Sequence, residues 1–148
     1  MFSLKPPVFE WYRLAAEQGQ AAYQFIIGNC YFYGMDVVQD YVEAVKWYRK
    51  AADQGNSNAQ INLGNCYENG LGVLKDYIEA YAYFNLAAVI RDEASTGLAR
   101  LEEKMSMEAQ LKGQQRTKEL QKKMGKKTRR LTQQSPCPWQ FIWFRGRG

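Results

Sequence analysis

The sequence predicts an all-α fold in which similar helix pairs follow one another along the chain. The main observation is an internal repeat with a period of 36 residues, since residues 11–53 match residues 47–89 at 20 of 43 positions. Within each repeat, apolar residues recur at helical spacing, and glycines separate the apolar stretches. A period of roughly 20–50 residues is typical of proteins whose units stack to bury a continuous core.

Each repeat is predicted to begin with a helix, which in the later copy covers residues 57–69. Ala59, Leu63 and Tyr67 fall on one face of this helix. Gly64 lies on the same face and has no side chain, so another helix can approach closely there. Glycines at 70 and 72 are expected to end the helix, because glycine readily adopts the left-handed conformation that follows a last helical turn.

A second helix is expected over about 76–90. Asp76 is a candidate N-cap, and Glu79 three residues later gives the pattern of a capping box. Its buried stripe consists of Ala80, Tyr83, Phe84 and Ala87. The preceding unit repeats this organisation with Asp40, Glu43, Ala44, Trp47, Tyr48 and Ala51. Asp36 occupies the position of Gly72, which is acceptable because aspartate visits the left-handed region more readily than most residues.

These patterns divide the chain into a half repeat and two full repeats. The repeat domain is expected over 8–110, and its parts are a half repeat at 8–20, full repeats at 21–56 and 57–92, and capping helices at about 93–124. A basic and aromatic tail over 125–148 is expected to be disordered. Stacked repeats need about three units for stability, so we expect either a truncated longer array or a small array that self-associates.

The repeat resembles a known family. The pattern A-x3-L-G-x2-Y-x2-G-x-G-V-x2-D-x3-A-x2-W/Y-x3-A-A, which runs from Ala59 to Ala87-Ala88, is similar to the Sel1-like repeat of the tetratricopeptide-like superfamily. The segment from Leu98 to Lys122 resembles the capping helices of bacterial members. The resemblance implies a right-handed α/α solenoid that binds a protein or peptide on its concave face as an adaptor or scaffold. It identifies no particular partner.

The partner-binding face can be predicted from helix geometry. If Leu63 and Tyr67 point inward, the opposite side of the first helix is free for a partner, and this side also includes Ile61. Asparagine can donate to and accept from a peptide backbone, and aromatic residues are enriched at interfaces. The alternative is ordinary packing for the aromatic residues and a solvated surface for the asparagines. The candidate partner-binding residues are Phe25, Asn29, Phe32, Tyr33, Asn58, Asn65, Glu68 and Asn69.

Charge is distributed unevenly along the chain. The net charge is +5, but residues 1–90 carry six basic and nine acidic groups, whereas 91–148 carry fourteen basic and six acidic groups. The alternative function is therefore binding of nucleic acid or an anionic membrane surface through residues 112–148. The tail has no aromatic residues among its basic ones before Trp139, so sequence-specific recognition is not indicated. The aromatic end can also be read as a non-native extension.

Catalytic and metal-binding patterns are not evident in the sequence. The chain contains no histidine, which excludes histidine-based catalysis and metal ligation. Cys30 and Cys66 occupy the same position in adjacent repeats, where packed helices lie too far apart for a disulfide, and Cys137 lies in the tail. We therefore expect a protein that is not an enzyme and binds no cofactor. The cysteine usage and the lack of a visible signal peptide favour a cytoplasmic location.

Overall fold

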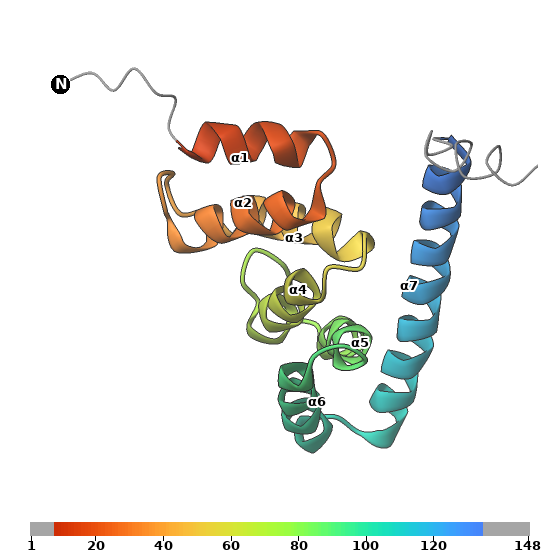
Figure 1. The fold of residues 1–148 in the computed structure, drawn as a ribbon. Coiled ribbons are helices and arrows are strands. Elements are labelled where there is room, and N and C mark those ends of the chain that lie inside the picture. Colours follow the sequence, from red (N-terminus) through yellow and green to blue (C-terminus); the bar gives the residue numbers. More distant parts are fainter. Residues whose placement is uncertain (1–7, 135–148) are drawn as a thin grey trace, which may run out of the picture.

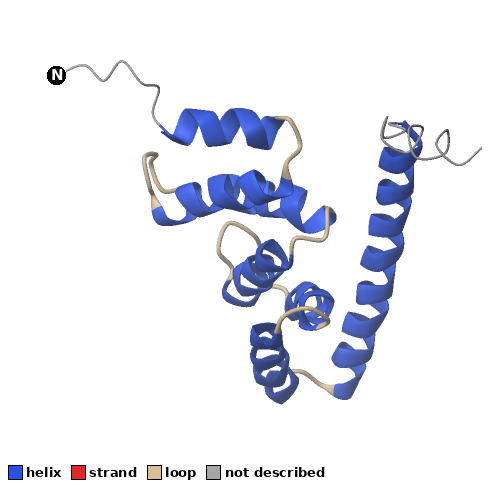
Figure 2. Ribbon diagram, in the orientation of Figure 1, coloured by secondary structure: helices blue, strands red, loops and turns tan. Residues whose placement is uncertain are grey.

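The structure, a computed structural model, describes residues 8–134, with side chains through residue 127. The described residues form helices and connecting turns, with no strand among them (Figure 2). The helices are α1 (Val8–Glu17), α2 (Ala21–Tyr33), α3 (Tyr41–Asp53), α4 (Ser57–Asn69), α5 (Tyr77–Ala88), α6 (Asp92–Lys104) and α7 (Met107–Gln134). The predicted all-α fold is confirmed.

The helices stack in the order of the repeats (Figure 1). Each full repeat is a hairpin of two helices, α2 with α3 and α4 with α5, and α3 packs against α4 to join the two hairpins. Helix α1 packs on α2 and matches the second helix of a repeat, and residues 8–134 include no first helix before it. Helix α6 covers α5, and α7 turns back to lie alongside α5.

Close packing within each hairpin depends on one glycine and one aromatic ring. Tyr48 and Phe84 are equivalent in the repeat and are 0% and 1% exposed. A methyl group added to Gly28 would lie 2.5 Å from the Tyr48 ring, and one added to Gly64 would lie 2.7 Å from the Phe84 ring. The predicted close helix approach at Gly64 is confirmed, and its cause is the aromatic side chain that fills the space.

The second helices begin with the aspartate caps that the sequence indicates, but only half of the capping box forms. Asp40 Oδ1 accepts hydrogen bonds from the backbone amides of Val42 and Glu43, and Asp76 caps α5 in the same way. The backbone amide of Asp40 donates to the Tyr31 carbonyl at 2.8 Å. It is therefore not available to the Glu43 carboxylate, which pairs with Lys46 instead.

The turns between paired helices use left-handed residues as expected. Gly34 and Gly70 end α2 and α4 with φ of 69° and 68°. Asp36, at the position of Gly72, has φ of 61°, so the aspartate does adopt the left-handed conformation. Gly72 has a second requirement, because an added methyl group would collide with the Tyr41 carbonyl at the start of α3.

Helix α7 differs from the sequence-based expectation at its end. It continues to Gln134, about ten residues beyond the boundary expected near 124. Gly125 does not break it, because a single exposed glycine costs about 1 kcal/mol in a helix and the surrounding lysine, arginine and glutamine residues are good helix formers. The tail was expected to be disordered from 125. Residues 125–134 are helical in the structure, and the remainder, 135–148, lies outside the described residues.

Candidate functional site

Glu68 does not lie on a free face of the first helix, which corrects the placement predicted from helix geometry. Its side chain is 4% exposed because α6 covers it. Arg100 donates to Glu68 through Nε at 2.8 Å and Nη2 at 2.5 Å, and Lys104 donates at 3.1 Å. The hydrogen bond from Arg100, more than any other contact, lowers the pKa of the Glu68 carboxyl. Glu68 therefore fastens α6 to α4.

Two of the predicted asparagines are also engaged inside the molecule. Asn29 Oδ1 accepts from the Tyr48 hydroxyl at 2.7 Å and from Asn62 Nδ2 at 3.2 Å. Asn58 Oδ1 accepts from Arg91 Nη2 at 2.5 Å. Both side chains join helices of the stack, which leaves them fewer hydrogen-bonding groups for a partner.

The predicted aromatic residues divide between packing and exposure. Phe25 and Phe32 are half-buried, with ring centroids 6.1 and 6.2 Å from that of Tyr48. Tyr33 is 64% exposed and has its ring 4.9 Å from that of Phe32. Asn65 is half-buried, and the exposed Asn69 donates from Nδ2 to the Asn65 carbonyl at 2.9 Å. Tyr33, Asn65 and Asn69 are thus the members of the predicted set that remain most available to a partner.

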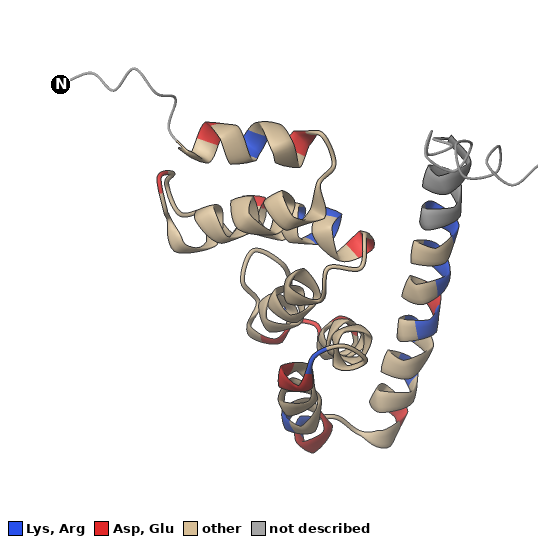
Figure 3. Ribbon diagram, in the orientation of Figure 1, with Lys and Arg blue, Asp and Glu red and all other residues tan. Residues whose placement is uncertain are grey.

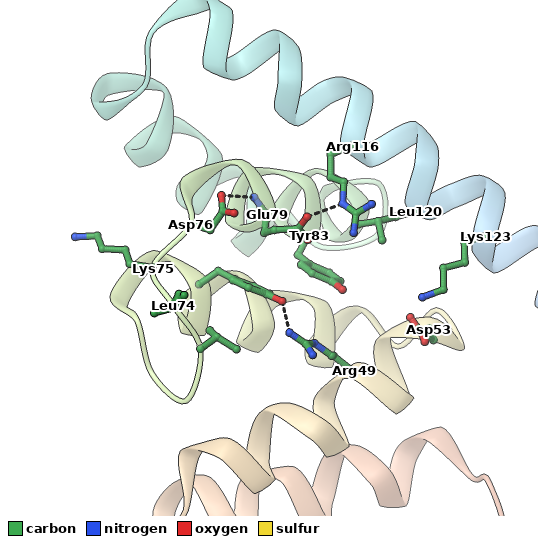
Figure 4. Close-up of a pocket in the computed structure, with 12 residues that line it drawn as sticks. Arg49, Asp53, Leu74, Lys75, Asp76, Glu79, Tyr83, Arg116, Leu120 and Lys123 are labelled. Atoms are coloured by element: carbon green, nitrogen blue, oxygen red, sulfur yellow. Dashed lines mark hydrogen bonds and ion pairs between the residues drawn. The ribbon is translucent and has the colours of Figure 1, made fainter.

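A groove lies elsewhere, between the stack and the returning helix α7 (Figure 4). It has a volume of about 730 Å³, and we call it the α7 groove. Side chains from α3, α4, α5, α7 and the turn before α5 form its walls. The lining residues are Arg49, Asp53, Tyr67, Val73, Leu74, Lys75, Asp76, Glu79, Tyr83, Arg116, Leu120 and Lys123.

Two stacked tyrosines and an arginine form one wall of the α7 groove. The rings of Tyr67 and Tyr83 are nearly parallel, with centroids 5.8 Å apart and an interplanar angle of 7°. The Arg49 guanidinium lies 5.8 Å from the centroid of the Tyr67 ring and donates to the Tyr67 hydroxyl. Burial raises the pKa of Tyr83 above its ordinary value.

The carboxylates of the α7 groove already have partners within the protein. Asp76 caps α5, and Glu79 pairs with Arg116 at 2.5 Å. Asp53 lies 3.8 Å from Lys127. Lys75 lies over the Tyr77 ring at 5.1 Å, and neither it nor Arg49 nor Lys123 forms an ion pair within residues 8–127.

An exposed apolar surface occurs on α1. Val8, Trp11 and Leu14 are 60%, 64% and 56% exposed, and Trp11 and Leu14 border a shallow pocket of about 490 Å³. In the full repeats the equivalents of Trp11 are Trp47 and Tyr83, which are 9% and 6% exposed. The difference arises because no first helix precedes α1 in the described structure.

Neither thiol in the described residues forms a disulfide. Cys30 and Cys66 are free and buried, which confirms the prediction made from helix spacing. Burial raises the pKa of Cys66 to about 11. Cys137 lies outside the described residues. Across residues 8–127, no group of three or more acidic or cysteine side chains is placed to hold a metal ion. None of the helices in the described part is both long and apolar enough to cross a bilayer.

Several residues that join helices or line the α7 groove are not among those predicted from the sequence. Gln24 and Gln60 are 5% and 3% exposed, and each donates to the C-terminal end of the preceding second helix, at the Ala16 and Ala52 carbonyls. The sequence contains a signal for this role, because glutamine occupies the same helix position in both repeats. Arg49 and Tyr83 were not assigned to a site because their neighbour α7 carries no repeat pattern.

Together these features define an α/α solenoid of short helical hairpins, closed at one end by α6 and α7. The family model of the Sel1 repeat matches residues 9–20, 21–56 and 57–88, which is more than half of the chain. The chain therefore belongs to the Sel1 repeat family, as its repeat pattern indicates.

Solved structures support the same assignment. A protective antigen of uropathogenic Escherichia coli that displays an SLR fold is 33% identical, with a TM-score of 0.77 over 85% of this chain. A Sel1 repeat protein from Oxalobacter formigenes is 41% identical, with a TM-score of 0.59 over 61% of this chain. The alignments span 27% and 37% of those two proteins. No curated protein matches the chain significantly.

Proposed function

We propose that this chain is a non-catalytic interaction module with an adaptor or scaffold role, and that it binds a segment of a partner protein in the α7 groove. Sel1 repeats in general mediate protein–protein interactions and are generally non-catalytic. The location of the site and the absence of catalysis in this particular chain are parts of the proposal.

The α7 groove is the observation that carries the proposal. Its volume of about 730 Å³ falls in the range of about 300–1,000 Å³ typical of ligand sites. It combines the stacked Tyr67 and Tyr83 rings with the apolar side chains of Val73 and Leu74. Arginine is among the residues enriched at energetically important interface positions, and Arg49 is exposed, whereas the two tyrosines are 9% and 6% exposed and form a buried wall of the groove. Leu74 is 91% exposed, so it is available to a partner at the groove edge.

The first-helix face that the sequence predicts is the competing location. Tyr33, Asn65 and Asn69 are its most available members, but Glu68 is covered by α6 and Asn29 and Asn58 are bonded within the stack. A partner on that face would meet few free polar groups. This favours the α7 groove over the first-helix face.

Peptide selection with site-specific variants tests the proposal. The full chain is used to select from a phage-displayed library of random twelve-residue peptides, and the affinity of each selected peptide is measured by fluorescence anisotropy. We expect Leu74→Ser to weaken binding about tenfold, because it removes an apolar groove contact and leaves the charge of the groove unchanged. The exposed position of Leu74 keeps the variant folded, which circular dichroism verifies.

The matched control is the triple variant Tyr33→Ala/Asn65→Ala/Asn69→Ala, which alters the first-helix face and leaves the α7 groove intact. We expect it to bind the selected peptides as the parent protein does. If binding is lost in the control and retained in Leu74→Ser, the site lies on the first-helix face and the groove is rejected.

The alternative function, binding of nucleic acid or a membrane surface through 112–148, gains no support from the described residues. Basic side chains are concentrated on α7 (Figure 3), but several are paired. Lys112 contacts Glu108 at 2.8 Å, Arg116 contacts Glu79 and Glu119, and Lys127 lies near Asp53. Self-association stays a prediction, and the exposed apolar face of α1 is where we expect it.

A further inference from the structure

The α7 groove carries more positive charge than its own carboxylates balance. Four basic and three acidic residues line it. Each of the three carboxylates already has a partner. Asp76 caps α5, Glu79 pairs with Arg116, and Asp53 lies near Lys127. Lys127 adds a further positive charge at the edge. The positive groups with no carboxylate partner among the described residues therefore determine which ligand charge the groove favours.

Arg49 and Lys123 are two such groups on different walls of the groove, the first on α3 and the second on α7. Arg49 extends from α3 beside the tyrosine wall, and Lys123 extends from α7 toward α3 (Figure 4). Arg116, Leu120 and Lys123 are spaced by four and three residues and so share one face of α7. Arg49 uses one nitrogen for the Tyr67 hydroxyl, and a guanidinium has five N–H donors, so most remain for a ligand.

The composition of the groove also distinguishes between kinds of anionic partner. Asp53, Asp76 and Glu79 line the same space and would repel the closely spaced phosphates of a nucleic acid. Val73 and Leu74 offer apolar contact beside the basic groups. A ligand that carries a few carboxylates among apolar side chains therefore fits the groove better than a continuous polyanion does.

We propose that the α7 groove selects an acidic peptide segment of the partner protein, with carboxylates held by Arg49 and Lys123 and an apolar side chain packed against Val73 and Leu74. This inference rests on the proposed function and specifies the chemistry of its partner. Arg49 supplies the planar donor geometry that suits a carboxylate. Lys123 supplies a second charge from the opposite wall, so a peptide with two separated acidic residues engages both sides of the groove.

The same peptide library tests this inference, because the charge of the selected sequences is itself a measurement. We expect aspartate and glutamate to be enriched over their frequency in the unselected library. We expect the double variant Arg49→Gln/Lys123→Gln to bind the selected peptides about tenfold more weakly, because two solvent-accessible ion pairs are lost. The loss should shrink at high salt.

A matched control removes the same charge outside the groove. Lys118 and Lys122 are exposed residues of α7 that do not line the groove, and Lys118→Gln/Lys122→Gln should leave the affinities unchanged. The charge-reversed variant Arg49→Glu/Lys123→Glu provides a second measurement, because it should select basic peptides from the unselected library.

The outcomes separate this inference from the proposed function. Peptides that lose affinity in Leu74→Ser but show no acidic enrichment and are unaffected by Arg49→Gln/Lys123→Gln overturn the acidic partner and leave the groove as the binding site. An equal loss in both double-glutamine variants overturns it as well, because it indicates nonspecific electrostatic attraction. Peptides unaffected by Leu74→Ser, or the selection of no peptide, overturn the proposed function and this inference together.

Discussion

Replacing Gly64 by alanine tests how closely the helices of a repeat are packed. A methyl group at this position would lie 2.7, 2.8 and 2.9 Å from three carbons of the Phe84 ring. Ordinary carbon–carbon contacts are about 1 Å longer. The ring is 1% exposed, and Gly97 of α6 approaches the same three carbons. Since neither glycine leaves the ring room to shift, the substitution must push α4 away from α5.

The expected effect is the difference between two opposing contributions. Overpacking a buried site costs about 1–3 kcal/mol, and an overlap of this size on a confined ring belongs at the upper end. Alanine in place of glycine within a helix stabilises the folded state by about 1 kcal/mol. We therefore expect Gly64→Ala to lower the free energy of unfolding by about 2 kcal/mol and the Tm by about 8 °C.

Urea and thermal unfolding followed by far-UV circular dichroism measure this difference. Gly125 is the matched control, because it is also helical and has no atom within 4 Å of an added methyl group. Gly125→Ala should raise the free energy of unfolding by up to about 1 kcal/mol. Phe84→Leu should be less damaging in the Gly64→Ala background than alone. If Gly64→Ala proves as stable as the parent, the steric reasoning is refuted.

Three further predictions concern charge, thiol reactivity and association. Glu68→Gln should lower the free energy of unfolding by about 1–2 kcal/mol at neutral pH. The folded state lowers the pKa of Glu68 from its ordinary value of 4.5. The difference in stability should therefore vanish as the pH falls below 4.5 and through the folded pKa, and a difference that persists at pH 2 would contradict the prediction. Native Cys66, with its pKa raised to about 11, should react with iodoacetamide far more slowly than in urea, and mass spectrometry that finds equal rates would disprove this. Trp11→Glu should reduce any concentration-dependent association of the full chain in sedimentation velocity, because Trp11 is 64% exposed; unchanged association would exclude the α1 face.

Features that depend on neighbouring residues could be predicted from the sequence. Helix α4 covers Ser57–Asn69, the range that its apolar spacing and terminal glycine indicate. Asp40 and Asp76 cap their helices because the geometry of an N-cap is set within one turn. The predicted stripe of α5 is buried, but Tyr81, Ala82 and Leu86 are buried too, because α6 and α7 also pack against this helix.

Features that depend on distant elements could not be predicted in the same way. Glu68 is acidic and near the end of a helix, which suggests an exposed residue, and only the position of α6 shows that Arg100 covers it. The α7 groove likewise requires knowledge that α7 returns along the stack. Arg116 and Glu79, which join α7 to α5, have no sequence relationship that identifies them as partners.

The return of α7 has a consequence for how the chain folds. In a simple array each unit touches its immediate neighbours, so folding can proceed one hairpin at a time. Here Lys127 reaches Asp53, and Gly113 packs against Tyr81, so late residues complete the environment of earlier ones. Contacts between residues far apart in the sequence slow folding, because a long loop must close before they form. The α7 groove therefore exists only when α7 is docked on the stack, because Arg116, Leu120 and Lys123 of α7 line it.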